Sequence, residues 1–122
     1  MVTRVGVRRV YEEPGPSDGV RVLVDRLWPR GMSHERADWD GWVKGVAPSA
    51  ELRRWYGHDP ERYREFVRRY EAELDDEGHR RALEELRRLA DDGPVTLLTA
   101  TRDLEHAHTK VLARLLREGW ES

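Results

Sequence analysis

The chain has 122 residues, enough for one domain with its own hydrophobic core. Its 22 Lys and Arg nearly balance 24 Asp and Glu, and the formal net charge of −2 argues against a dedicated nucleic-acid-binding protein. The absence of Cys excludes disulfides, a thiolate nucleophile and a Cys-ligated zinc. No apolar run approaches the roughly 20 residues of a membrane span, and the N-terminus lacks the apolar region of a signal peptide. We therefore expect a cytoplasmic protein without a membrane partner.

Three segments predict β-strands. Val2–Tyr11 is rich in Val, while Val20–Leu27 and Val95–Ala100 place apolar residues on both alternating faces, as buried central strands do. The loop Glu12–Gly19 between the first two strands is short for a parallel crossover, so the pattern leaves the direction of the first strand open.

Helical spacing dominates the rest of the chain. Apolar residues at i, i+3, i+4 and i+7 predict a short helix capped by Ser33, and further helices follow from cap and stop signals. The short helix contains Trp39, Trp42, Val43 and Val46. Two further helices begin at Pro48-Ser49 and at Asp59-Pro60, the next one ends at Gly93-Pro94, and the last spans Leu104–Arg117. This order predicts an α/β fold, with a small, mostly parallel sheet of about three strands flanked by helices in three layers. We expect one compact domain over residues 1–122.

Polar residues are concentrated where the second and third predicted strands end. They are Asp25, Arg26, Trp28 and Arg30 after one strand, and Arg102 and Asp103 after the other. Ligands bind outside the carboxyl ends of parallel strands, and Arg binds phosphate or carboxylate with two hydrogen bonds. The N–H groups of the helix that follows also favour an anion. We therefore predict that these residues bind a small anionic molecule, with Arg26, Arg30 and Arg102 as the anchors.

His108 lies one turn into the last predicted helix, on the face toward the sheet. An imidazole beside clustered Arg has a perturbed pKa, so His108 is the candidate general acid or base, with Asp25 as its alternative or its orienting partner. Structural interpretations stay open: His108 as a core histidine, Asp25 and Arg26 as members of ion pairs, and Asp103 as a helix cap. The residues leave open both which cofactor, if any, the protein uses and whether it is an enzyme.

The segment Trp55–Pro60 is a second candidate, because aromatic side chains beside a His can wall a pocket. We include Trp55 and His58 as ligand-binding candidates, and the alternative is that the aromatics are core residues before a Gly stop. No metal site is predicted, since His106 and His108 are two residues apart and lie on different helix faces. Glycine-rich phosphate loops and the GxSxG motif are also absent.

Several blocks occur in an order that resembles a known family. They are Val24–Gly31 (VDRLWPRG), Ala47–Arg53 (APSAELR), Trp55–Pro60 (WYGHDP), Val95–Leu98, Arg102-Asp103 and His106–His108. Over nearly its whole length the chain resembles the YeaO-like family of small bacterial and archaeal proteins, domain of unknown function 488. The resemblance implies a single compact α/β domain, a cytoplasmic setting and a parallel first pair of strands, and it implies no activity. Family members usually carry Asn at the position of Ala107.

These patterns favour a protein that binds a small anionic ligand, phosphate or carboxylate, at the carboxyl edge of the sheet, with acid–base catalysis as an added option. The alternative is a non-catalytic interaction or self-association module, in which Trp39, Trp42 and Trp55 form the contact surface and the Arg/Asp cluster is structural. Nucleic-acid binding is a remote third option, and the sequence does not specify the oligomeric state.

Overall fold

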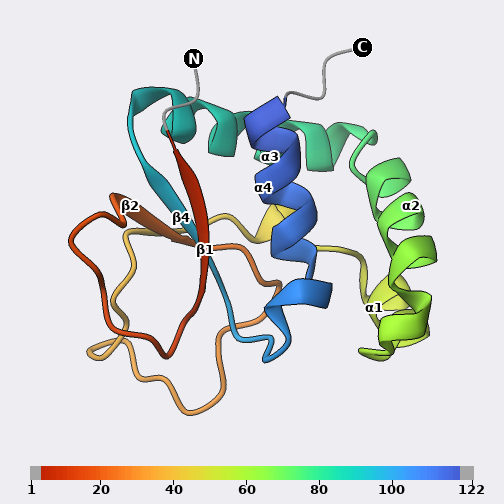
Figure 1. The fold of residues 1–122 in the computed structure, drawn as a ribbon, viewed down its shortest axis with the longest axis horizontal. Coiled ribbons are helices and arrows are strands. Elements are labelled where there is room, and N and C mark those ends of the chain that lie inside the picture. The colour runs from red at the N-terminus through yellow and green to blue at the C-terminus, as the bar shows by residue number, and fades with distance from the viewer. Residues whose placement is uncertain (1–3, 119–122) are drawn as a thin grey trace.

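Four segments form the strands of a small parallel sheet in the computed structural model, which describes residues 4–118 (Figure 1). The strands are β1 (Val5–Arg9), β2 (Val20–Leu23), β3 (Gly41–Trp42) and β4 (Val95–Thr99), in the order β1-β4-β2-β3, with every neighbouring pair parallel. The predicted α/β class and parallel sheet are confirmed, and the two-residue β3 is an additional strand. Val2 and Thr3, at the start of the first predicted strand, lie outside the described residues.

β4 is the central strand, and all five of its residues are buried. β1 and β2 pair with opposite edges of β4, where Val95 aligns with Val5 on one side and with Val20 on the other. The first two strands are therefore parallel without being neighbours, which answers the question that the short loop left open. The connection between them crosses β4, and Thr96 Oγ1 donates a 2.8 Å hydrogen bond to the carbonyl oxygen of Asp18 within it.

Four α-helices follow the cap and stop signals. They are α1 (Ala50–Tyr56), α2 (Tyr63–Glu73), α3 (Glu77–Asp92) and α4 (His108–Glu118). α1 begins after Ser49, whose Oγ accepts a capping hydrogen bond, and ends at Gly57 in the left-handed conformation. The predicted last helix is divided, because Leu104–His106 form a 3₁₀ turn and Ala107 is extended before α4 starts at His108. None of the described helices is long and apolar enough to cross a membrane.

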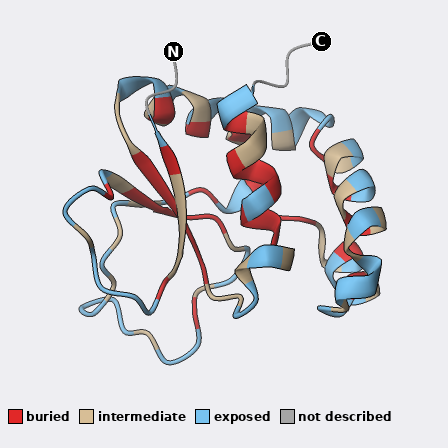
Figure 2. Cartoon of the chain, in the orientation of Figure 1, coloured by how far each residue is buried: buried red, intermediate tan, exposed pale blue. Residues whose placement is uncertain are grey.

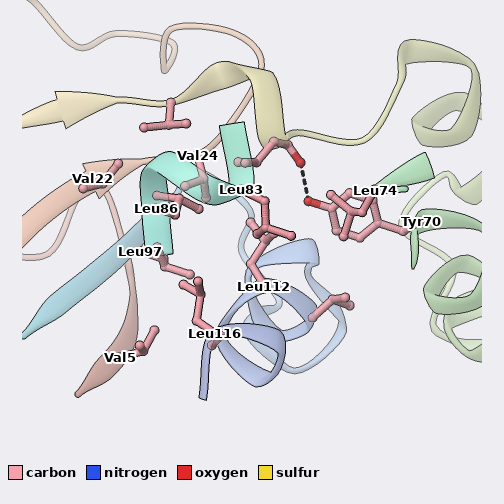
Figure 3. Close-up of a cluster of buried hydrophobic side chains, with 14 of the residues drawn as sticks. Val5, Val22, Val24, Tyr70, Leu74, Leu83, Leu86, Leu97, Leu112 and Leu116 are labelled. Carbon is pink, nitrogen blue, oxygen red and sulfur yellow. Dashed lines mark hydrogen bonds between the residues drawn. The ribbon is translucent and has the colours of Figure 1, made fainter. Parts of the chain in front are cut away.

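All four helices contribute to one hydrophobic core, which they form with a single face of the sheet. Figure 3 shows Val22 and Leu97 of the sheet and Leu112 of α4 among the buried side chains of this core. Tyr70 of α2 is also fully buried here, and its hydroxyl donates a 2.5 Å hydrogen bond to the carbonyl oxygen of Val46, drawn as a dashed line in Figure 3. The core thus joins the sheet to α1, α2 and α3, the helices that lie between β2 and β4 in the chain.

The opposite face of the sheet carries a second, smaller cluster. It consists of Val10, Leu23 and Leu98, with Trp39 and Ala100 packed against them. No described helix contributes to this cluster, and the loop that contains Trp39 packs there instead. The predicted three-layer arrangement is therefore wrong, because the described helices all lie on one side of the sheet. Figure 2 shows the burial along the strands and on the sheet side of α4, and the exposed loops beside them.

The short helix predicted after Ser33 does not form. Residues 24–40 make a long loop, and β3 and a single 3₁₀ turn at Lys44–Val46 follow it. Backbone hydrogen bonds hold this region against β2, since Val43 N–H donates to the carbonyl oxygen of Leu23 at 2.9 Å. Pairing with the sheet edge satisfies the backbone groups that a helix would have bonded internally.

Candidate functional site

One large cavity opens at the carboxyl ends of β1, β2 and β4, with a volume of about 1100 Å³. Eight of the predicted site residues line it: Asp25, Arg26, Trp28, Arg30, His58, Arg102, Asp103 and His108. The side chains selected from the ends of two strands therefore surround one space. The volume is slightly above the range of pockets that hold a small organic molecule, about 300–1,000 Å³.

Arginines dominate the charge of the cavity lining. They are Arg9 from the end of β1, Arg26 and Arg30 after β2, Arg53 and Arg54 from α1, and Arg102 after β4. Among the described residues, the carboxylates that line the cavity are those of Asp25 and Asp103. Apart from Arg9, none of these guanidinium groups has a hydrogen bond or an ion pair to the part of the chain that the structure describes. The lining thus carries positive charge that these residues do not neutralise.

Arg9 is the least exposed of the six arginines. Its Nη2 donates to the carbonyl oxygen of Ala100 at 3.4 Å, and its guanidinium carbon lies over the ring of Tyr11, 5.0 Å from the ring centre. Its Nε is buried and has no hydrogen-bond partner within residues 4–118. A buried donor without an acceptor costs about 1–3 kcal/mol.

Asp25 is fixed at the sheet edge by hydrogen bonds. Its carboxylate accepts from Thr99 Oγ1 and from the backbone N–H of Ala100, both at 2.7 Å. Its carbonyl oxygen accepts from Nε1 of Trp42, also at 2.7 Å. These bonds join the end of β2 to the end of β4. The carboxylate of Asp25 is thus bonded to Thr99 and Ala100, whereas the structural interpretation expected it to form an ion pair.

His108 is buried at the start of α4 and lines the cavity. Its Nε2 lies 3.1 Å from the carbonyl oxygen of Val24 and 3.5 Å from Oδ1 of Asp25. Burial lowers the pKa of His108, the positive charge of Arg53 adds to the shift, and Asp25 and the Val24 carbonyl oppose it. The ring is therefore neutral at pH 7, and its Nδ1, which bonds to no described residue, can accept a hydrogen bond from a ligand.

A second Asp–His pair lies at the rim of the cavity. Oδ2 of Asp103 is 2.7 Å from Nδ1 of His106, and this hydrogen bond lowers the pKa of Asp103. Asp103 occupies the N-cap position of the 3₁₀ turn, where its carboxylate bonds to the ring of His106 within the same turn. Tyr56 donates to the carbonyl oxygen of His106 at 2.6 Å, and Tyr63 donates to that of Ala107 at 3.0 Å. Burial raises the pKa of both tyrosines to about 12, so they remain donors and anchor this segment.

Trp55 and His58, predicted together, lie in different environments. Trp55 is absent from the cavity lining and packs partly buried against the main core, with the guanidinium carbons of Arg62 and Arg69 at 5.4 and 4.1 Å from its ring centre. The core interpretation therefore describes Trp55. His58 lines the cavity from an exposed turn, with a backbone φ of 56°. Positive φ strains a non-Gly residue, and such strain clusters at functional sites.

Three of the lining arginines were missed by the sequence reasoning. Arg9 ends the first strand, and the strand-end argument reaches it only when β1 is known to lie beside β4. Arg53 and Arg54 lie in the last turn of α1, and helical spacing predicts that both face solvent. The signal that could have indicated Arg53 is its place at the end of the APSAELR block, one of the blocks that carry the family resemblance.

Residues 4–122 match a protein family described as "Inactive DUF488-N3 subclade". The chain belongs to this family. It is 53% identical over 114 residues to "Uncharacterized protein Rv3073c" of Mycobacterium tuberculosis (strain ATCC 25618 / H37Rv), covering 93% of this chain and 94% of that protein. It is 39% identical over 110 residues to "Uncharacterized protein YeaO" of Escherichia coli (strain K12), covering 90% and 94%. The resemblance to the YeaO-like proteins is confirmed, and no solved structure matches the chain.

Proposed function

We propose that this protein binds a small anionic ligand, a phosphate or a carboxylate, in the cavity at the carboxyl edge of the sheet. The observation that supports the proposal is the set of six arginines that line the cavity, five of them without a partner among the described residues. Like charges gathered in one cleft repel one another and raise the local positive potential. An anion relieves this repulsion and accepts paired hydrogen bonds from guanidinium groups.

In this proposal Arg26, Arg30 and Arg102 hold the anionic group, and the ring of Trp28 walls the cavity. His108 offers its free Nδ1 to a hydroxyl or N–H of the ligand, because Nε2 is engaged by the backbone of the sheet. A cytoplasmic setting, expected from the sequence, is part of the same proposal.

Binding without turnover is the form of this function that we favour. The description of the matched family contains the word "inactive". The cavity lining includes Ala107, which brings no polar group at a position that usually carries Asn in the resembled family. The neutral, buried His108 beside Asp25 supports a general base as the second candidate. A general-base role requires turnover of the bound ligand, and a ligand recovered unchanged after prolonged incubation with the protein would contradict it.

Thermal unfolding with inorganic phosphate and with small carboxylates, at constant ionic strength, tests the proposal. A ligand at 100 times its Kd adds about 2.7 kcal/mol to the stability, which is several degrees in Tm. We expect wild type to show this shift and the double variant Arg26→Ala/Arg102→Ala to lose it. The control Arg68→Ala/Arg81→Ala removes the same charge at side chains that are 75% and 79% exposed and do not line the cavity. Equal shifts in wild type and the cavity variant would refute anion binding at this place.

A further inference from the structure

We infer that the ligand carries a chain of linked phosphates, such as the triphosphate of a nucleotide or a free polyphosphate. This inference rests on the proposed function and narrows the class of its ligand. Six arginines and two aspartates line the cavity, which leaves an excess of four positive charges before any histidine is counted. A phosphate monoester brings only about −1.5 to −2 charges at neutral pH. A triphosphate chain brings about twice that charge and matches the excess.

The placement of the arginines also favours an extended anion. They come from four separate segments: the end of β1, the loop after β2, the last turn of α1 and the residues after β4. A guanidinium group binds a phosphate through two parallel hydrogen bonds, so one phosphate has oxygens for only a few such groups. Linked phosphates let arginines on different walls of the cavity each bind a different group.

Two of these walls can be identified from contacts. Arg9 is fixed on the β1 side by the carbonyl oxygen of Ala100 and the ring of Tyr11. Arg53 is on the α1 side, near enough to His108 for its charge to lower the pKa of that imidazole. Neither guanidinium group has a carboxylate partner among the described residues. A single ligand that binds both has to extend from the end of β1 to α1.

The size of the cavity agrees with such a ligand. Its volume is about 1100 Å³, whereas one water molecule occupies about 30 Å³ of liquid and a phosphate ion only a few times more. A single phosphate would leave most of the lining in contact with solvent. A phosphate chain with an organic group attached would fill a larger part of the space and bury more of the arginine side chains.

Binding titrations with phosphate, pyrophosphate, tripolyphosphate and ATP, at constant ionic strength and without Mg²⁺, test the inference. We expect the affinity to rise with each added phosphate, with tripolyphosphate at least tenfold tighter than phosphate. ATP at least as tight as tripolyphosphate would support a nucleotide, and tripolyphosphate tighter than ATP would support a free polyphosphate. Equal affinities for phosphate and tripolyphosphate would overturn this inference and leave the proposed function standing. Binding of none of these anions, together with no Tm shift with the small carboxylates of the thermal-unfolding test, would overturn both.

The double variant Arg53→Ala/Arg54→Ala tests the reach of the ligand. Both side chains are exposed in the last turn of α1, so we expect the variant to fold, and thermal unfolding checks this. We expect it to lose at least tenfold in affinity for tripolyphosphate and less than threefold for phosphate, because phosphate can bind at the other arginines. Arg68→Ala/Arg81→Ala is again the control of equal charge. Equal losses for the two probes, or equal losses in the control, would contradict an extended ligand.

Discussion

Nε2 of His108 lies 3.1 Å from the carbonyl oxygen of Val24, and the same nitrogen lies 3.5 Å from the Asp25 carboxylate. A carbonyl oxygen only accepts, so Nε2 carries the hydrogen and donates it. In the neutral ring Nδ1 is then the unprotonated nitrogen. The end of β2 therefore selects the tautomer of His108 and leaves one acceptor for the cavity.

The pH dependence of stability follows from the buried ring of His108. Its pKa in the folded protein is lower than the usual value near 6.5, chiefly because of burial. Below about pH 6.5 the unfolded chain takes up a proton that the folded protein does not, so stability falls as the pH decreases toward the folded pKa. We expect wild type to lose more stability than His108→Gln between pH 7 and pH 5 in urea unfolding. The Gln amide can still donate to Val24, and parallel curves for the two proteins would contradict the assignment.

The ion pair of Asp18 and Arg21 makes a second prediction. Both side chains are buried, 2.5 Å apart, and the pKa of Asp18 is lowered, first by the N–H of Gly15 and then by Arg21 and Arg8. Removing one member leaves an unpaired buried charge, so Asp18→Asn is expected to cost about 3–5 kcal/mol at pH 7. Chemical denaturation measures this loss, and the exposed Asp92→Asn serves as the control.

The contribution of the Asp18–Arg21 ion pair to stability decreases at low pH. Because the folded pKa of Asp18 is below the unfolded value near 3.9, the ionised carboxylate contributes stability above that pH and loses it as the pH falls further. We expect the difference in the free energy of unfolding between wild type and Asp18→Asn to become smaller below pH 4. A constant gap down to pH 2 would show that the charge of Asp18 does not stabilise the loop.

The position of the cavity was predictable from the sequence because of one property of parallel sheets. Their carboxyl ends lie at a common edge whatever the strand order, so Asp25, Arg102 and their neighbours had to be close once both strands were recognised. Apolar runs identified β2 and β4, which pair directly and are buried as predicted. The same argument did not reach Arg9, since nothing in the sequence places β1 on the far side of β4.

The loop between β2 and β3 shows why other features were not predictable. β3 has two residues, too few to display the alternation by which a strand is recognised. Trp39 and Trp42 follow helical spacing in the sequence, but in the structure both pack against Trp28. The centre of the Trp28 ring lies 5.0 Å from that of Trp39 and 5.5 Å from that of Trp42. Aromatic contacts between loop residues leave no periodic trace in the sequence.

Two glycines with positive φ form a matched pair for mutation. Gly19 has a φ of 66°, and a Cβ added there would lie 2.2 Å from the carbonyl oxygen of Pro94. Gly31 has a φ of 77°, and nothing lies within 4 Å of its Cβ position. Gly31→Ala therefore adds backbone strain alone, about 1 kcal/mol, whereas Gly19→Ala adds strain and overlap, about 3 kcal/mol or more. Urea unfolding of both variants measures the difference, and equal losses would contradict the close approach of Gly19 to Pro94.

His58 is the non-Gly residue with positive φ in the described part of the chain, and it follows Gly57, which is also left-handed. The left-handed conformation costs a residue with a Cβ about 1–2 kcal/mol, and Gly avoids this cost. His58→Gly is therefore expected to be about 1 kcal/mol more stable than His58→Ala in thermal unfolding. Both variants remove the imidazole from the cavity, so both are expected to show the same reduced response to phosphate. Equal stabilities would show that the turn is not strained, and a phosphate response unchanged from wild type would show that His58 does not contact the ligand.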